Sequence, residues 1–141
     1  MNIGIVGSEG AKFTPETEQK ARVLIRLSIS PNDKVISGGC HLGGIDIWAV
    51  EEAKALGLQY KEFLPKTKNW EGFKARNIQI AESSDKVICI TVKTLPPSYK
   101  VKGWEKFCYH CNTDQHIKSG GCWTVKYAQK LGKITSVIVV E

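Results

Sequence analysis

The alternation of short apolar runs with helix-forming segments constrains this chain more than any other feature of its sequence. Five strands are predicted, near residues 3–6, 35–36, 59–64, 87–90 and 135–140. Four amphipathic helices are predicted between them, over residues 14–30, 45–56, 72–83 and 122–131. A helix between successive strands makes a crossover connection, so the strands pair in parallel. The sequence therefore predicts an α/β domain with a five-stranded, mostly parallel sheet and helices on both faces.

Local patterns refine this prediction at the element ends. Thr14 followed by Pro15 is typical of a helix start, because the hydroxyl can cap the first turn and proline suits it. Gly57 and Gly132 are expected to end helices. The first, fourth and fifth strands are apolar throughout, and we expect them to be buried on both faces of the sheet.

The length and composition fit one folded domain. The chain has 141 residues, of which 42% are hydrophobic and 24% charged, as in globular proteins. We expect one domain over residues 1–141. No apolar run approaches the ~20 residues of a membrane span, and the first residues are typical of a strand and not of a signal peptide. The expected location is therefore cytoplasmic, with no membrane partner.

Residues 93–119, called the insertion below, interrupt the alternation. A polar stretch of 27 residues is too long for an idle loop and usually carries a function. Residues 93–133 hold eight Lys or Arg against two Asp or Glu, which accounts for the net charge of +6 of the whole chain. This basic region favours phosphates or nucleic acid as partners, or else is a solvated lysine-rich loop.

Three glycine-rich turns follow predicted strands, at Gly7–Gly10, Gly38–Gly44 and Gly120–Gly121. Ligands of parallel sheets bind at such carboxyl ends, where glycine lets the backbone approach a phosphate and a following helix directs free N–H groups at it. Two Ser-Gly-Gly-Cys runs, at residues 37–40 and 119–122, are each expected to open a helix directly. Neither the G-x-G-x-x-G dinucleotide fingerprint nor a P-loop is present.

A family resemblance rests on three motifs in this order. They are Ser37-Gly38-Gly39-(x3)-Gly43-Gly44-Ile45-Asp46-(x2)-Ala49, then Arg76-Asn77-(x3)-Ala81-(x2)-Ser84-Asp85-(x)-Val87, then Gly120-Gly121-(x2)-Thr124. Together they resemble the DprA/LOG-type (SLOG) Rossmann-like superfamily. That superfamily includes DNA-processing protein A, the cytokinin-activating phosphoribohydrolases and the small YspA-like proteins, which are closest in size. The resemblance implies a Rossmann-like fold and a nucleotide-type ligand.

The resemblance also implies which residues bind that ligand. Asp46 matches an acid that can accept ribose hydroxyls, although it can equally cap its helix. Arg76 matches an arginine beside the substrate phosphate or ribose, and pairing with Glu82 or Asp85 is the alternative. The expected ligand-binding residues are Gly7, Ser8, Ser37, Gly38, Gly39, Gly43, Gly44, Asp46, Arg76, Asn77, Gly120, Gly121 and Thr124.

The catalytic signature of the phosphoribohydrolases, G-G-x-G-T-x-x-E, is altered here. Trp123 replaces a glycine, and Tyr127 stands where the catalytic glutamate is expected. Loss of this carboxylate removes a general acid or base, so catalysis does not transfer simply. The candidates for a catalytic role are Arg76, Glu51 and Glu52, and both glutamates also fit an exposed helix face.

The insertion carries a metal-ligand pattern. Cys108, Cys111, His116 and Cys122 form C-x2-C-x4-H-x5-C, one residue longer than the zinc-knuckle spacing. Zinc would fold a loop that has no core of its own. His110 and His41 compete with Cys122 as the fourth ligand, and free thiols on a surface loop are the alternative to a metal site.

Three functions fit this sequence. The first is a sensor, binding protein or weak hydrolase that holds a nucleotide or another phosphate-bearing small molecule at the glycine turns. The second is a nucleic-acid-binding protein that uses the basic insertion, whose aromatic residues can stack on bases. The third is a phosphoribohydrolase-like N-glycosidase. A homo-oligomer is compatible with all three. The aromatic residues in question are Tyr99, Trp104, Phe107, Tyr109 and Trp123.

Overall fold

The computed structural model describes residues 1–141 and contains one five-stranded sheet. Its strands run in the order β3-β2-β1-β4-β5, and every neighbouring pair is parallel. The predicted α/β fold is thus confirmed, with the sheet wholly and not only mostly parallel. The strands are β1 (Asn2–Gly7), β2 (Lys34–Ser37), β3 (Gln59–Glu62), β4 (Lys86–Val92) and β5 (Ile134–Val140).

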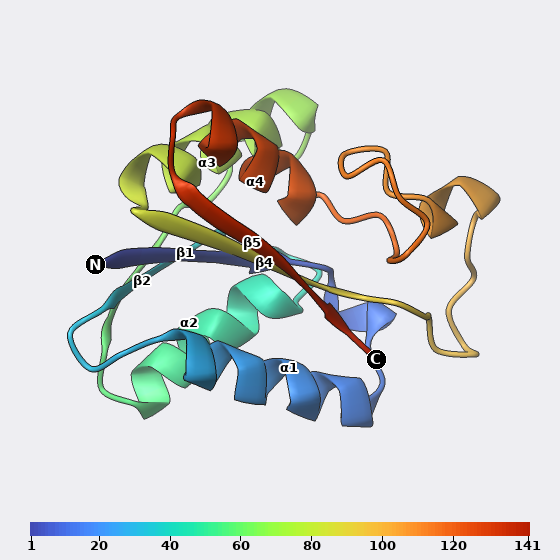
Figure 1. Ribbon diagram of the computed structural model, residues 1–141, viewed down its shortest axis with the longest axis horizontal. Coiled ribbons are helices and arrows are strands. Elements are labelled where there is room, and N and C mark those ends of the chain that lie inside the picture. The colour runs from blue at the N-terminus through green and yellow to red at the C-terminus, as the bar shows by residue number, and fades with distance from the viewer.

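Helices cover both faces of the sheet (Figure 1). Helices α1 and α2 lie on one face and α3 and α4 on the other. Each pair of helices packs against the sheet through an apolar core of its own. None of the helices is long and apolar enough to cross a membrane. The helical elements are η1 (Gly10–Lys12), α1 (Pro15–Ser28), α2 (Ile45–Ala55), α3 (Trp70–Ser83), η2 (Gly103–Lys106) and α4 (Gly121–Lys130).

The starts of the helices follow local sequence, with one correction. The Thr14 hydroxyl accepts a hydrogen bond of 3.1 Å from the Thr17 amide, as expected of an N-cap. Helix α4 begins inside the second Ser-Gly-Gly-Cys run, also as expected. The first run does not open its helix directly. A turn through Gly43 and Gly44, with φ of 73° and 88°, separates it from α2.

The prediction that β5 is buried on both faces is wrong. It pairs only with β4 and forms one edge of the sheet, so most of its residues are half-buried and Ile134 is 59% exposed. Strands β1 and β4 lie inside the sheet and are buried as expected. An apolar run identifies a strand, but its position in the sheet depends on the strand order, which no local pattern contains.

The strand order places a crevice at the carboxyl ends of β1 and β4. Chain connections leave β1 toward one face and β4 toward the other, and such a switch point is where open parallel sheets bind ligands. The insertion leaves the end of β4 and lies beyond this edge of the sheet before it enters α4 (Figure 1). A hydrogen bond of 2.9 Å from the Ile117 amide to the Val92 carbonyl anchors its return.

Candidate functional site

A cavity of about 620 Å³ lies at the carboxyl edge of the sheet. Residues of all three glycine-rich turns line it, together with residues of α3 and of the insertion. This volume lies within the range of small-molecule sites, which is roughly 300–1,000 Å³. The site predicted at the switch point therefore corresponds to a hollow large enough for a nucleotide-sized molecule.

Glycine is required in these turns partly for packing. A Cβ at Gly121 would lie 2.9 Å from the Gly7 amide nitrogen and from the Cys89 sulfur. A Cβ at Gly7 would collide with the Ile90 carbonyl oxygen. The first turn of α4 thus lies directly against the end of β1, and this contact tolerates no side chain.

The expected ligand-binding residues divide into two groups. Nine line the cavity: Gly7, Ser8, Gly39, Asp46, Arg76, Asn77, Gly120, Gly121 and Thr124. Ser37, Gly38, Gly43 and Gly44 do not. The Ser37 hydroxyl instead donates to the Ile5 carbonyl at 2.7 Å, and so holds the end of β2 against β1. Gly43 and Gly44 shape the turn that leads to α2.

Asp46 and Thr124 are the most informative of the lining residues. Both side chains are buried, yet Asp46 Oδ1 and Thr124 Oγ1 form no hydrogen bond. Burial raises the pKa of Asp46 to about 6, against the opposing effects of Arg76 and the Gly7 amide. Buried polar atoms are normally satisfied, so two orphaned oxygens on residues that line one cavity require an explanation.

Four cations line the cavity, and two of them are held in place by hydrogen bonds. Arg76 Nε donates to Asn77 Oδ1 at 2.9 Å and Nη1 to the Gly38 carbonyl at 3.3 Å. It forms no ion pair with Glu82 or Asp85, which was the alternative expectation. Lys12 Nζ donates to the Lys118 carbonyl at 3.1 Å. The four cations are Lys12, Lys68, Arg76 and Lys118.

Aromatic residues form part of the wall. Trp70 and Phe73 come from α3, and Tyr99 and Trp104 come from the insertion. The Tyr99 hydroxyl lies 3.1 Å from a Glu9 oxygen and 3.0 Å from a Glu105 oxygen. Burial and these two carboxylates raise the pKa of Tyr99, so it stays a neutral donor. This contact ties the insertion to the turn after β1.

The glutamates considered for catalysis lie outside the cavity. Glu52 pairs with Arg22 at 3.0 Å and with Arg26, and Glu51 pairs with Arg22 at 2.9 Å, so both connect α2 to α1. Tyr127 also lies outside the cavity and stacks on Trp123, with ring centroids 5.5 Å apart. Of the three residues named as catalytic candidates, only Arg76 lines the cavity.

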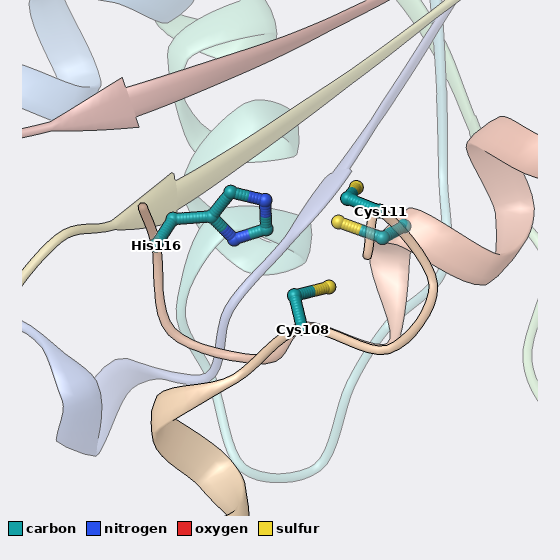
Figure 2. Close-up of side chains that lie close together, drawn as sticks. Cys108, Cys111 and His116 are labelled. Atoms are coloured by element: carbon teal, nitrogen blue, oxygen red, sulfur yellow. The ribbon is translucent and has the colours of Figure 1, made fainter. Parts of the chain in front are cut away.

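Beside the cavity, the insertion and α4 form a cysteine–histidine cluster of Cys108, Cys111, His116 and Cys122. The ligand atoms of these four residues lie within 4.8 Å of one another. Figure 2 shows the sulfurs of Cys108 and Cys111 and the ring of His116 facing a common space. The cluster can therefore hold a metal ion. It contains neither His110 nor His41, which were the competing fourth ligands.

Local structure explains why these side chains converge. The Cys108 amide donates to the Thr113 carbonyl at 2.8 Å, and Asn112 adopts a left-handed φ of 54°, so the chain reverses between Cys108 and Thr113. His116 Nδ1 lies 2.9 Å from the Ile117 carbonyl, and only a protonated nitrogen can bond there. That bond leaves Nε2 free to act as a ligand.

The thiols of the cluster differ in their electrostatic surroundings. Burial opposes ionisation of Cys108, but hydrogen bonds from backbone amides, those of Cys111 and Ser119 first, and from the Cys122 thiol outweigh burial and lower its pKa. Burial, followed by the nearby Cys122, raises the pKa of Cys111 to about 12. Cys108 and Cys122 are fully buried, so these thiols are not on a surface loop, the alternative to a metal site.

Sequence reasoning missed part of both sites. Lys12, Lys68 and Glu9 line the cavity, and Cys89 lies with its sulfur 3.8 Å from that of Cys122. Glu9 lies within the first glycine turn and Lys12 follows it closely, so the sequence could have indicated both. Cys89 lies in an apolar run that predicts only a buried strand, so no local pattern distinguishes it.

Comparison with known proteins supports the fold. No protein-family model and no curated protein matches the chain. Among solved structures, the molybdenum cofactor carrier protein from Chlamydomonas reinhardtii is similar, with a TM-score of 0.62 and 19% sequence identity. The match covers 96% of this chain and 74% of that one. At this level of identity the similarity shows a common Rossmann-like fold and nothing finer.

Proposed function

We propose that this protein binds a nucleotide or nucleotide-derived phosphate ligand in the cavity at the carboxyl ends of β1 and β4. The observation that carries this proposal is the pair of unsatisfied oxygens on Asp46 and Thr124 in a cavity lined by four cations. A buried polar atom without a partner costs roughly 1–3 kcal/mol. A ligand that supplies the missing partners removes this cost.

The anionic part of the ligand is expected at the start of α4. Gly120 is the N-cap and Gly121 the first residue of this helix, so the positive end of the helix dipole lies at the cavity. Lys118 and Lys12 add positive charge there. Phosphate is the anion that such an arrangement favours in α/β folds.

A neutral part of the ligand is expected against Asp46. Its carboxylate accepts hydrogen bonds and repels an ionised phosphate, so it fits hydroxyl or amino groups such as those of ribose or a base. Phe73 and Trp70, which also line the cavity, offer faces on which a planar ring can stack. A ligand with a phosphate, hydroxyl groups and a planar ring satisfies all three parts of the wall.

The comparison adds one specific ligand to be tested. The fold neighbour is described as a carrier of the molybdenum cofactor. Molybdenum cofactor therefore belongs in the ligand screen beside nucleoside mono-, di- and triphosphates. Native mass spectrometry of the purified protein tests the proposal most directly, because a retained ligand and a bound metal appear as separate mass increments.

For the cysteine–histidine cluster we propose Zn²⁺ as the bound ion. Three thiolates and one imidazole are a ligand set that zinc accepts in tetrahedral structural sites. The antiparallel bridge between Cys108 and Thr113 and the hydrogen bond from His116 Nδ1 to the Ile117 carbonyl support this assignment. With four protein ligands and no open position, the role of the ion would be structural.

The exposed aromatic residues of the insertion favour nucleic acid as a second candidate ligand. Trp104, Phe107 and Tyr109 are 57, 42 and 60% exposed, and Lys118 lies over the rings of Trp104 and Tyr109. Exposed rings among cations suit single-stranded nucleic acid. Binding of oligonucleotides that weakens steeply with salt would favour this candidate, whereas mononucleotide binding with little salt dependence favours the first.

A further inference from the structure

The cysteine–histidine cluster and the cavity share one short segment of chain. His116 and Cys122 both contribute ligand atoms to the cluster. Between them, Lys118, Ser119, Gly120 and Gly121 line the cavity. A metal ion in the cluster would therefore hold both ends of the segment that forms one wall of the ligand site.

The cluster ligands themselves do not line the cavity. None of Cys108, Cys111, His116 and Cys122 is among the lining residues, and Cys108 and Cys122 are fully buried. An ion held there would be separated from a ligand by the backbone of the segment 117–121. Any effect of the ion on ligand binding would thus act through the conformation of this segment.

Contacts with β4 and with the insertion also hold the segment 117–121, and Gly121 packs closely against Gly7 and Cys89. The Ile117 amide donates to the Val92 carbonyl at 2.9 Å, and the Lys118 amide donates to the Glu105 carbonyl at 2.8 Å. Glu105 itself belongs to η2 of the insertion. The second bond thus depends on the position of the insertion, which Cys108 and Cys111 would tie to α4 when a metal is bound.

The crowding of sulfur atoms in the cluster favours a bound cation. Cys122 lies between the sulfur of Cys89, at 3.8 Å, and the other cluster thiols. A divalent cation converts such crowded sulfurs into ligands, because it stabilises the thiolate form.

We propose that a bound metal ion, of the soft divalent class to which Zn²⁺ belongs, clamps the segment 117–121 and so preorganises the phosphate-binding wall of the cavity. Metal and ligand would bind at separate sites and strengthen each other. The coupling is reciprocal, because the metal ion and the cavity ligand each favour the ordered form of the segment 117–121. The effect on ligand affinity rests on the proposed function, whereas the clamping of the segment does not.

Hydrogen exchange tests the clamp without any ligand. The metal-loaded protein is compared with protein stripped by a chelator, and exchange is followed by mass spectrometry at peptides covering 93–123 and at peptides of β1 and β4. We expect metal removal to raise exchange of 117–121 by at least about tenfold, because an unclamped segment opens locally. Unchanged exchange of this segment would overturn the proposal.

Two histidines of the insertion supply a matched pair of variants. His116→Gln removes a cluster ligand and should lose both metal and protection of 117–121, whereas His110→Gln should keep both. His116→Cys should restore both, since thiolate is a zinc ligand. Protection of β1 and β4 reports whether each variant remains folded. Loss of protection in His116→Gln that His116→Cys does not restore, despite bound metal, would count against the clamp.

Adenosine monophosphate then tests the coupling. Titration calorimetry of the loaded and stripped protein should show affinity weaker by about tenfold or more without metal, because the segment must then be ordered on binding. Equal affinities would overturn the coupling. No binding to the loaded protein would contradict the proposed function for this nucleotide, and the exchange result would still decide the clamp.

Discussion

Asp46 and Thr124 lie in the first turns of two helices on opposite faces of the sheet, yet both line the same cavity and each carries a buried oxygen without a hydrogen-bond partner. Thr124 follows Asp46 by 78 positions in the chain (124 − 46). They meet at one site because the chain leaves β1 toward one face of the sheet and β4 toward the other.

Stability should depend on pH through Asp46. Its pKa is raised to about 6 in the folded protein from 3.8, so the ionised form destabilises the native state above pH 6. This destabilisation is relieved as the pH falls through 6 and is absent below about pH 4. Asp46→Asn should therefore raise the free energy of unfolding at pH 8, by on the order of 2–3 kcal/mol at 1.36 kcal/mol per pKa unit.

Urea denaturation of both proteins at pH 8 and pH 5 measures this difference. The gain from Asp46→Asn should be smaller at pH 5, where the native carboxyl is largely protonated. An equal gain at both pH values would show that the effect comes from packing and not from the ionised carboxylate.

Adjacent glycines should respond differently to the same substitution. Gly121→Ala should destabilise the fold by about 1–3 kcal/mol, because the new methyl meets Gly7 and Cys89. Gly120→Ala should be nearly neutral for stability, because no atom lies within 4 Å of the added Cβ. Thermal unfolding of the two variants distinguishes these outcomes. Equal melting temperatures would mean that α4 does not pack closely on β1.

A phosphate-bearing ligand should raise the melting temperature, since it binds only the native state. Arg76→Lys should reduce this shift and weaken binding about tenfold, because the guanidinium is fixed in the cavity wall by hydrogen bonds to Asn77 and Gly38, a geometry that an ammonium does not reproduce. Arg26→Lys is the control, since Arg26 pairs with Glu52 away from the cavity. If no nucleotide, molybdenum cofactor or other phosphate ester stabilises the protein, the proposed function is wrong.

Phosphoribohydrolase turnover should be absent or very slow. Loss of a positioned acid or base commonly costs ~10²–10⁴-fold in rate. Tyr127→Glu should not restore activity, because this position packs on Trp123 and does not line the cavity. Chromatography of free base after incubation with nucleoside monophosphates measures the reaction. Rapid base release by the unmodified protein would assign catalysis to another acid, such as Asp46.

Elemental analysis should find about one zinc per chain, held by one tetrahedral site. Cys108→Ser should lose the metal, whereas Cys40→Ser should retain it, because Cys40 lies outside the cluster. Cys111→Ser should also make residues 93–119 sensitive to protease while the sheet remains resistant. A metal-free protein with a protease-resistant insertion would contradict the zinc assignment.

Much of the fold and part of the site could be predicted from the sequence. Helix starts such as Thr14 depend on hydrogen bonds between residues three positions apart, so a local pattern is sufficient. The spacing of Cys108, Cys111 and His116 indicated the cluster for the same reason, because all three lie in one short loop. The glycine turns located the cavity, since carboxyl ends of parallel strands share an edge.

Features that depend on which distant segments meet were decided only by the tertiary structure. The apolar residues of β5 are as compatible with the middle of a sheet as with its edge, and the strand order places them at the edge. Cys89 lies beside Cys122, and Tyr99 beside Glu9, through contacts between segments remote in sequence. Local patterns were sufficient for the elements, the turns and the metal-ligand spacing, because each depends on neighbouring residues. The packing of the chain decided which side chains share the cavity, because burial and long-range contacts arise only when the elements assemble.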